Sequence, residues 1–289
     1  MTTRRDFIKQ SSLFTAAMFV STDEIFKKQK RIGVQLYTVR GDLGKDAKGT
    51  IEKIAKLGYK EIETFGYNQG KWFGMTATEL SDVFKANGLT SPSGHTFPGS
   101  LFLKDGWETT WIKAVEDGKT LGQRYIVIPW LEDQHRKSLD NYKKVADGLN
   151  KAGSICKQAG MQIAYHNHDF EFVDLGEGQN GFDTLMANTD KTIVNMELDI
   201  YWAVKAGKDP IALFEKHPGR FVMWHVKDMD NTEKKAFTEV GSGVIDWKKI
   251  FGKANKSGMT NFFVEQDICP GPPLDSLAKS ISYLKKKIV

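Results

Sequence analysis

Residues 193–227 read IVNMELDIYWAVKAGKDPIALFEKHPGRFVMWHVK, and this stretch decides the fold. Its two apolar runs, 193–200 and 221–227, have the composition of buried strands. Residues 210–215, between these runs, have a helical pattern, which predicts a crossover helix. Strands joined through a crossover helix lie parallel in one sheet, so the stretch predicts one repeating unit of an α/β fold.

The same alternation continues through the chain from residue 31. Predicted strands cover residues 31–37, 60–65, 89–95, 125–130, 162–168, 193–200, 221–227 and 262–266. Predicted helices cover residues 50–57, 78–87, 111–121, 139–159, 181–187, 210–215, 247–256 and 274–286. Eight such units predict a (β/α)8 TIM barrel, in a single domain from residue 23 to 289. A doubly wound sheet is disfavoured, because GVQLYT at residues 33–38 is not a glycine-rich phosphate loop.

The composition excludes several classes of protein. The 289 residues are 40% hydrophobic and 27% charged, as in a globular protein. No run of about 18 apolar residues is present, which excludes a membrane span. The formal net charge of +5 is too small to indicate a nucleic-acid partner, and two cysteines cannot form a disulfide scaffold.

The first 22 residues have the order of a bacterial export signal. TRRDFIK at residues 3–9 precedes a modestly apolar run, 11–20, and resembles a twin-arginine signal. No clear small-x-small cleavage site follows the apolar run. We therefore expect a periplasmic or otherwise exported protein that folds before transport.

Titratable residues recur where the predicted strands end. In a TIM barrel these ends meet at one mouth, where the chemistry takes place. Residues two apart on a strand share a face, so each pair at one strand end points the same way. The positions are Gln35 and Tyr37, Glu63, His95, Trp130, His166 and His168, Glu197 and Asp199, His225 and Lys227, and Glu265 and Asp267.

Carboxylates and imidazoles that converge on one mouth predict a site for one divalent metal ion. Asp199, His225 and Glu265 come from three consecutive strands and are the strongest ligand candidates. Oxygen and imidazole ligands suit Mn²⁺, Co²⁺, Zn²⁺ or Mg²⁺. Glu197 points the same way as Asp199 but lies deeper, so we interpret it as a buried partner that supports the ligands.

Several motifs carry a family resemblance over residues 31–287. They are YHNHDFEF at 165–172, ELDIYW at 197–202, AGKDP at 206–210, HVKDM at 225–229, GSGVID at 241–246 and VEQD at 264–267. In this order they resemble the sugar phosphate isomerase/epimerase family of the xylose isomerase-like TIM barrel superfamily. The resemblance implies the barrel fold and an enzyme that acts on carbohydrates.

The resemblance also implies how the metal is bound. In the superfamily a glutamate, an aspartate, a histidine and a second glutamate hold one divalent ion, and Asp199, His225 and Glu265 match the last three. Many relatives have Glu-Asn-His where this chain has His166-Asn167-His168. Either His166 replaces the first glutamate or Glu171 supplies the carboxylate, and we favour His166.

The remaining polar and aromatic residues at the strand ends suggest roles in catalysis. His168 is the candidate base, because a neutral imidazole accepts and returns a proton. Lys227 could stabilise a developing oxyanion, and Glu63 could be a second acid-base group. The predicted catalytic residues are His168, Glu63, Lys227 and Glu265, and the predicted substrate-binding residues are His95, Trp130, Trp202 and Glu171.

These residues predict a metal-dependent isomerase or epimerase that acts through an enediolate. The expected substrate is an unphosphorylated keto-sugar or 3-keto-glycoside, because no glycine-rich phosphate cradle follows the last two strands. A keto-glycoside lyase or hydrolase and a non-catalytic sugar-binding barrel remain alternatives. An abasic-site nuclease is less favoured, since it requires more metal ligands and a basic groove.

Overall fold

The computed structural model describes residues 31–289, so the predicted leader at residues 1–22 lies outside the described residues. Between residues 31 and 289, eight parallel strands close a barrel in the order β1-β2-β5-β6-β7-β8-β9-β12. Their bounds are β1 (Gly33–Gln35), β2 (Glu61–Thr64), β5 (Thr90–His95), β6 (Tyr125–Ile128), β7 (Gln162–His166), β8 (Val194–Asp199), β9 (Phe221–Val226) and β12 (Asn261–Val264). The predicted (β/α)8 TIM barrel is confirmed, and each predicted strand overlaps an observed one.

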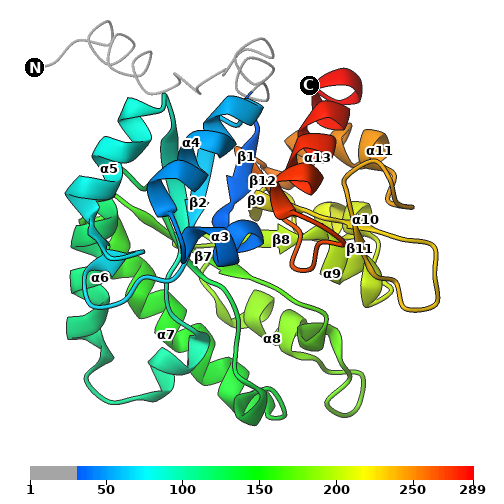
Figure 1. The fold of residues 1–289 in the computed structure, drawn as a ribbon. Coiled ribbons are helices and arrows are strands. Elements are labelled where there is room, and N and C mark those ends of the chain that lie inside the picture. Colours follow the sequence, from blue (N-terminus) through cyan, green and yellow to red (C-terminus); the bar gives the residue numbers. More distant parts are fainter. Residues whose placement is uncertain (1–30) are drawn as a thin grey trace, which may run out of the picture.

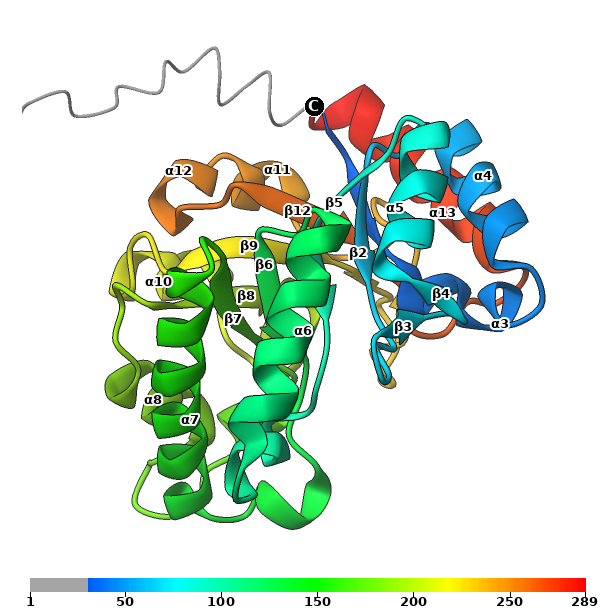
Figure 2. The same ribbon diagram turned by 90° about the vertical axis from the view of Figure 1, so that its left-hand side faces the viewer.

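Helices form a layer around the barrel, as Figures 1 and 2 show. They are α4 (Ala47–Leu57), α5 (Ala77–Ala86), α6 (Trp107–Leu121), α7 (Leu139–Gln158), α8 (Gly181–Asn188), α10 (Pro210–Lys216), α11 (Trp247–Phe251), α12 (Ala254–Ser257) and α13 (Pro273–Lys287). The last helix, α13, packs against α4 and closes the ring (Figure 1). The predicted helix 247–256 is interrupted at Gly252, so it forms the two short helices α11 and α12.

Local sequence explains where the helices begin and end. Thr76 and Glu79 form a capping box at the start of α5, in which each side chain bonds a backbone N–H of the other residue. Gly58 ends α4 with a φ of 101°, a left-handed conformation that favours glycine.

No helix in the described part of the chain is long and apolar enough to cross a membrane.

Short elements that the sequence analysis did not predict lie at the barrel mouth. The helical turns are η1 (Leu36–Val39), α3 (Arg40–Leu43), η2 (Gly99–Leu103), η3 (Asp133–His135), η4 (Phe170–Phe172) and α9 (Ile200–Lys205). Two hairpins join β3 (Lys71–Trp72) to β4 (Met75–Thr76) and β10 (Asp228–Met229) to β11 (Phe237–Thr238). Ile200 and Trp202 therefore lie on a helix that begins directly after β8, and not at the end of a strand.

Apolar side chains fill the barrel beneath the mouth. A small buried cluster includes Val127, Ala164, Met223 and Phe263 from different strands. Gly33 lies against Phe263, and a Cβ atom at Gly33 would come within 2.5 Å of that ring. The ring of Phe263 lies 6.4 Å from the ring of His225 at the mouth, so apolar packing reaches the site.

Candidate active site

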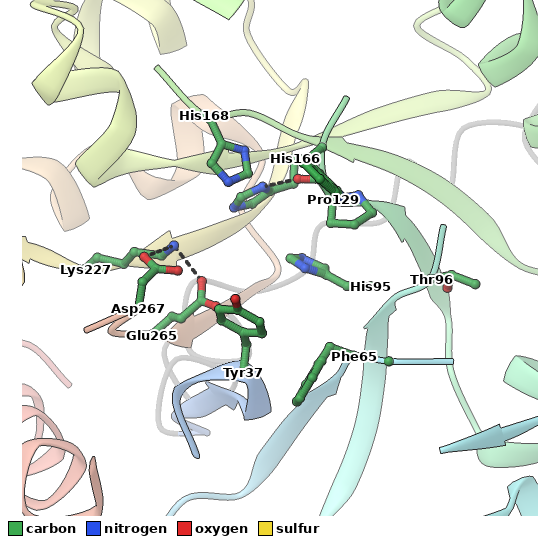
Figure 3. Close-up of a pocket in the computed structure, with 12 residues that line it drawn as sticks. Tyr37, Phe65, His95, Thr96, Pro129, His166, His168, Lys227, Glu265 and Asp267 are labelled. Atoms are coloured by element: carbon green, nitrogen blue, oxygen red, sulfur yellow. Dashed lines mark hydrogen bonds and ion pairs between the residues drawn. The ribbon is translucent and has the colours of Figure 1, made fainter. Parts of the chain in front are cut away.

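A cavity of about 390 Å³ opens at the carboxyl ends of the barrel strands. One part of its wall is aromatic or apolar and includes Tyr37, Phe65, Pro129 and Trp130. The other part is polar and includes His95, Thr96, His166, His168, Lys227, Glu265 and Asp267, most of which Figure 3 shows around one space. The cavity therefore combines an apolar surface with a concentrated set of titratable groups, as ligand sites commonly do.

Four buried side chains bring one ligand atom each to the same point. The atoms belong to His166, Asp199, His225 and Glu265, and they all lie within 4.8 Å of one another. His166 Nε2 lies 3.2 Å from Asp199 Oδ2, and His225 Nδ1 lies 2.7 Å from Glu265 Oε2. Despite this short distance, His225 Nδ1 has no hydrogen-bond partner. A buried imidazole nitrogen that lies against a carboxylate outside hydrogen-bond geometry, with two further ligand atoms close by, fits a divalent metal ion.

Hydrogen bonds with backbone groups orient two of these side chains, His166 and Asp199. His166 Nδ1 lies 2.9 Å from the carbonyl oxygen of Pro129, as Figure 3 shows. This contact leaves Nε2 of His166 to face Asp199. Asp199 Oδ1 accepts a hydrogen bond from the backbone N–H of Trp202 and caps α9, which leaves Oδ2 for the cluster. Asn167 Oδ1 accepts a hydrogen bond from the Asp199 N–H, a role that the sequence analysis missed.

Two further carboxylates lie beneath the cluster. Glu63 Oε2 is 2.5 Å from His225 Nε2, and it also accepts a hydrogen bond from Gln35. Glu197 Oε2 is 2.8 Å from His95 Nε2 and 3.3 Å from His225 Nε2. Both glutamates are fully buried and are not part of the cavity wall. Glu63, which we expected to contact substrate, is therefore placed where it orients His225.

The protonation states of Glu63 and Glu197 follow from their burial and from the charges around them. Burial raises the pKa of Glu63, but the His95 and His225 rings outweigh it and lower the pKa to about 2. Burial raises the pKa of Glu197 well above its ordinary value, and the charge of Glu63 raises it further. One carboxylate of the pair is thus ionised and the other protonated, as expected for close acidic groups.

Lys227 is surrounded by carboxylates at the cavity wall. Its ammonium group lies 2.9 Å from Asp199, 2.7 Å from Glu265 and 3.0 Å from Asp267, and Figure 3 shows the last two contacts. Burial alone lowers the pKa of Lys227, but these carboxylates more than offset it and raise the pKa above its ordinary value. Lys227 is therefore a permanent positive charge beside the ligand cluster, and Asp267 is a wall residue to which the sequence analysis gave no role.

The imidazole of His168 faces the same cavity and is held between aromatic rings. It stacks on Phe170 at 5.3 Å with an interplanar angle of 15°, and the Trp202 ring lies 5.3 Å away. Its Nδ1 is buried without a hydrogen-bond partner. Burial lowers the pKa of His168 well below 6.5, and the charges of His166 and Lys227 act in the same direction. The ring is therefore neutral and has a nitrogen available to accept a proton.

Glu171 supports the loop that carries His168. Glu171 Oε2 accepts a hydrogen bond from the His168 N–H at 2.7 Å, and Oε1 accepts one from the Tyr165 hydroxyl at 2.8 Å. Burial raises the pKa of Glu171 to about 8. The side chain is fully buried and belongs neither to the cavity wall nor to the ligand cluster. Of the two alternatives for the fourth ligand, the structure brings His166 to the cluster.

The predicted sugar-stacking tryptophans lie in different places. Trp130 lines the cavity and keeps 39% of its surface exposed. Trp202 is not part of the wall and packs against His168, Tyr201 and Phe237. Trp202 can therefore influence the site through the position of His168, whereas Trp130 can contact a ligand directly.

Asp228, directly after Lys227, holds the loop that borders the site. Its Oδ1 accepts hydrogen bonds from the N–H groups of Met229 and Ile245, and its Oδ2 accepts them from Gly241 N–H and the Trp247 indole. The side chain is only 1% exposed, so no water replaces these partners. Asp228 is therefore the attachment point of residues 239–246.

Replacement of Asp228 by Ala is expected to destabilise the protein strongly. The change leaves four N–H donors without their acceptor, and buried donors without partners cost about 1–3 kcal/mol each. We expect the free energy of unfolding to fall by about 3 kcal/mol or more in urea titrations. Asp82→Ala is the control, because Asp82 is exposed and pairs with the equally exposed Lys85 on the surface of α5. A loss no larger than in that control would show that Asp228 does not anchor the loop.

Comparison with known proteins identifies a family that shares this architecture. The sequence profile described as xylose isomerase-like TIM barrel matches residues 51–287. An inosose dehydratase from Clostridium beijerinckii is 30% identical over 194 residues, which are 60% of this chain and 63% of that protein, less than two thirds of its length. An inosose dehydratase from Clostridium perfringens is 27% identical over 239 residues, which are 73% of this chain and 79% of that protein. A solved sugar phosphate isomerase/epimerase from Parabacteroides distasonis is 28% identical, with a TM-score of 0.77 over 90% of this chain and 95% of that one.

Proposed function

Because this chain belongs to the xylose isomerase-like TIM barrel family, we propose that it is a divalent-metal-dependent enzyme that removes a proton beside the carbonyl group of an unphosphorylated keto-sugar. One observation carries the proposal. A neutral His168 lines the same cavity as His166 and Glu265, two members of the cluster of four metal-ligand atoms. A base beside a Lewis-acid site is the arrangement that proton abstraction next to a carbonyl requires.

The residues that would hold the ion are His166, Asp199, His225 and Glu265. Two imidazoles and two carboxylates suit Zn²⁺, Co²⁺ or Mn²⁺. When bound, the ion would polarise the substrate carbonyl and stabilise negative charge on its oxygen. Glu63 and Glu197 hold the imidazole of His225 from beneath, which fixes its orientation toward the cluster.

Three side chains of the cavity wall, His168, Lys227 and His95, would take the other roles in the reaction. His168 accepts the proton at the ring nitrogen that carries none in the neutral imidazole, and the Phe170 and Trp202 rings hold the imidazole in place. Lys227 provides a positive charge toward a substrate oxygen as negative charge develops there. His95 also lines the cavity, with its ring 5.0 Å from that of His166 and 5.1 Å from that of His225, and it would contact a sugar hydroxyl.

Proton abstraction of this kind begins elimination, isomerisation and epimerisation alike. The relatives named inosose dehydratases favour elimination, in which a group leaves from the carbon next to the carbanion. Isomerisation or epimerisation is the second candidate, supported by the likeness to the solved isomerase/epimerase. We also propose that TRRDFIK at residues 3–9 directs export, so that the enzyme meets unphosphorylated sugars outside the cytoplasm.

Proton exchange tests this proposal. The metal-loaded protein is incubated in D₂O with an inosose or with 3-keto-glucose, and the substrate is followed by nuclear magnetic resonance. We expect the proton beside the carbonyl to exchange for deuterium, and an unsaturated ketone to appear if the reaction is elimination. A sugar with altered connectivity or configuration would indicate the second candidate. A metal-loaded protein that binds these keto-sugars without exchange would contradict an enzymatic role and favour a binding function.

A further inference from the structure

Exposed apolar side chains gather at the carboxyl end of the barrel. Among residues 31–289 the exposed large hydrophobic residues are Tyr37, Ile112, Trp130, Val173, Val244 and Ile268. All but Ile112 stand in segments that follow a barrel strand, on the side where the cavity opens. Two of them, Tyr37 and Trp130, line the cavity while 38% and 39% exposed. Large aromatic side chains left half exposed around a cavity indicate that the ligand extends past its opening.

A second hollow lies directly beside the cavity. It has a volume of about 700 Å³, and its wall includes Asp133, Gln134, Arg136, Lys137, Phe170 and Val173. The two spaces share a dividing wall, because Arg136 lies 5.5 Å from the Trp130 ring and 3.6 Å from the Phe170 ring. Phe170 in turn stacks on His168. A molecule bound next to His168 therefore reaches this groove by passing Trp130.

The groove is held in place before any ligand binds. Arg136 donates a hydrogen bond to the carbonyl oxygen of Leu131 and pairs with Asp133 in the same turn. The guanidinium group of Arg136 also lies over the Phe170 ring, so contacts with Phe170 and with the turn at Leu131 and Asp133 fix the position of Arg136. The side chains of Gln134 and Lys137 have no such contacts among those described here, and they supply amide and ammonium groups to the groove.

We propose that this groove binds a second sugar ring, so that the substrate is a glycoside whose keto-sugar unit occupies the cavity. This inference rests on the proposed function. A sugar ring has an apolar C–H face and an edge of hydroxyl groups. Val173 and Leu175 offer apolar surface for the face, and Gln134 and Lys137 offer hydrogen-bond donors for the edge. Asp133 pairs with Arg136, so the wall leaves one ammonium group, that of Lys137, free to donate a hydrogen bond to a hydroxyl oxygen.

The experiment compares substrates of one and two rings on the full-length, metal-loaded protein. The probes are 3-keto-glucose and 3-keto-trehalose or 3-keto-cellobiose, measured by kcat/KM. We expect the two-ring probes to be preferred by about tenfold or more, mainly through a lower KM, since each added hydrogen bond contributes up to about that factor. In the double variant Gln134→Ala, Lys137→Ala the ratio of kcat/KM for two-ring probes to kcat/KM for the one-ring probe should fall toward one.

The control variant is Lys191→Ala, because Lys191 is exposed and precedes β8 at the opposite end of the barrel. It should leave the preference for two rings unchanged. Equal kcat/KM for one-ring and two-ring probes, or an equal loss for both in the groove variant, overturns the second subsite and leaves the proposed function in place. If the protein neither binds nor converts any of the probes, the proposed function itself fails.

Discussion

Glu265→Gln is expected to keep the fold and lose the metal ion. Glutamine has nearly the same shape, so packing around the side chain is retained, but it removes an anionic ligand from the four-atom cluster. Replacing groups that only support a ligand lowers metal affinity by about 10–100-fold, so loss of a ligand should exceed this range. Elemental analysis after dialysis measures the metal content, and turnover should be lost in parallel.

Glu239→Gln is the matched control for this substitution. Glu239 is also buried and hydrogen-bonded, but its partners are Ser276 and Lys279, outside the cavity. The control should retain its metal, and circular dichroism should show the same fold for both variants. Full metal occupancy in Glu265→Gln would mean that the ion binds elsewhere.

His168→Gln should separate catalysis from metal binding. Glutamine preserves a polar side chain of similar length but cannot take up the proton, and loss of a general base costs about 10²–10⁴-fold in kcat. The ligand cluster does not include His168, so the metal content should stay at the wild-type value. We expect kcat to fall with little change in KM, measured by deuterium exchange and steady-state kinetics.

His217→Gln controls for the general effect of removing an imidazole. His217 ends α10 before β9 begins, at the end of the barrel away from the cavity, so turnover should be unaffected. Wild-type turnover in His168→Gln would show that another group takes the proton. Loss of metal from His168→Gln would instead show that this ring helps to hold the ion.

The barrel was predictable because its strands are continuous apolar runs separated by helices with clear caps. Parallel strands also place their carboxyl ends on one side, so the sequence alone predicts that His166, Asp199, His225 and Glu265 meet at a common mouth. Alternation along a strand indicates which side chains point inward. It does not indicate how deep each one lies, because depth depends on the tilt and stagger of the strands.

The predicted and observed positions of some site residues differ for two reasons: the depth of a side chain in the barrel and the irregular shape of the loops. Glu63 points inward on β2, but it lies in the layer beneath the cavity and contacts His225. Glu171 lies on a short helical turn, where no simple periodicity predicts the direction of its side chain. The sequence predicts Asp199 as a metal ligand but not as the residue that caps α9, and this cap explains why Trp202 lies on a helix.

The contacts of Lys227 bear on how the protein matures. Acidic side chains crowded into a barrel would repel one another during folding, and a chain that depended on an outside cation could not close until one arrived. Here the ammonium group of Lys227 meets Asp199, Glu265 and Asp267 within 3.0 Å and supplies an internal counter-charge. Assembly of the barrel and acquisition of an ion can therefore be separate events.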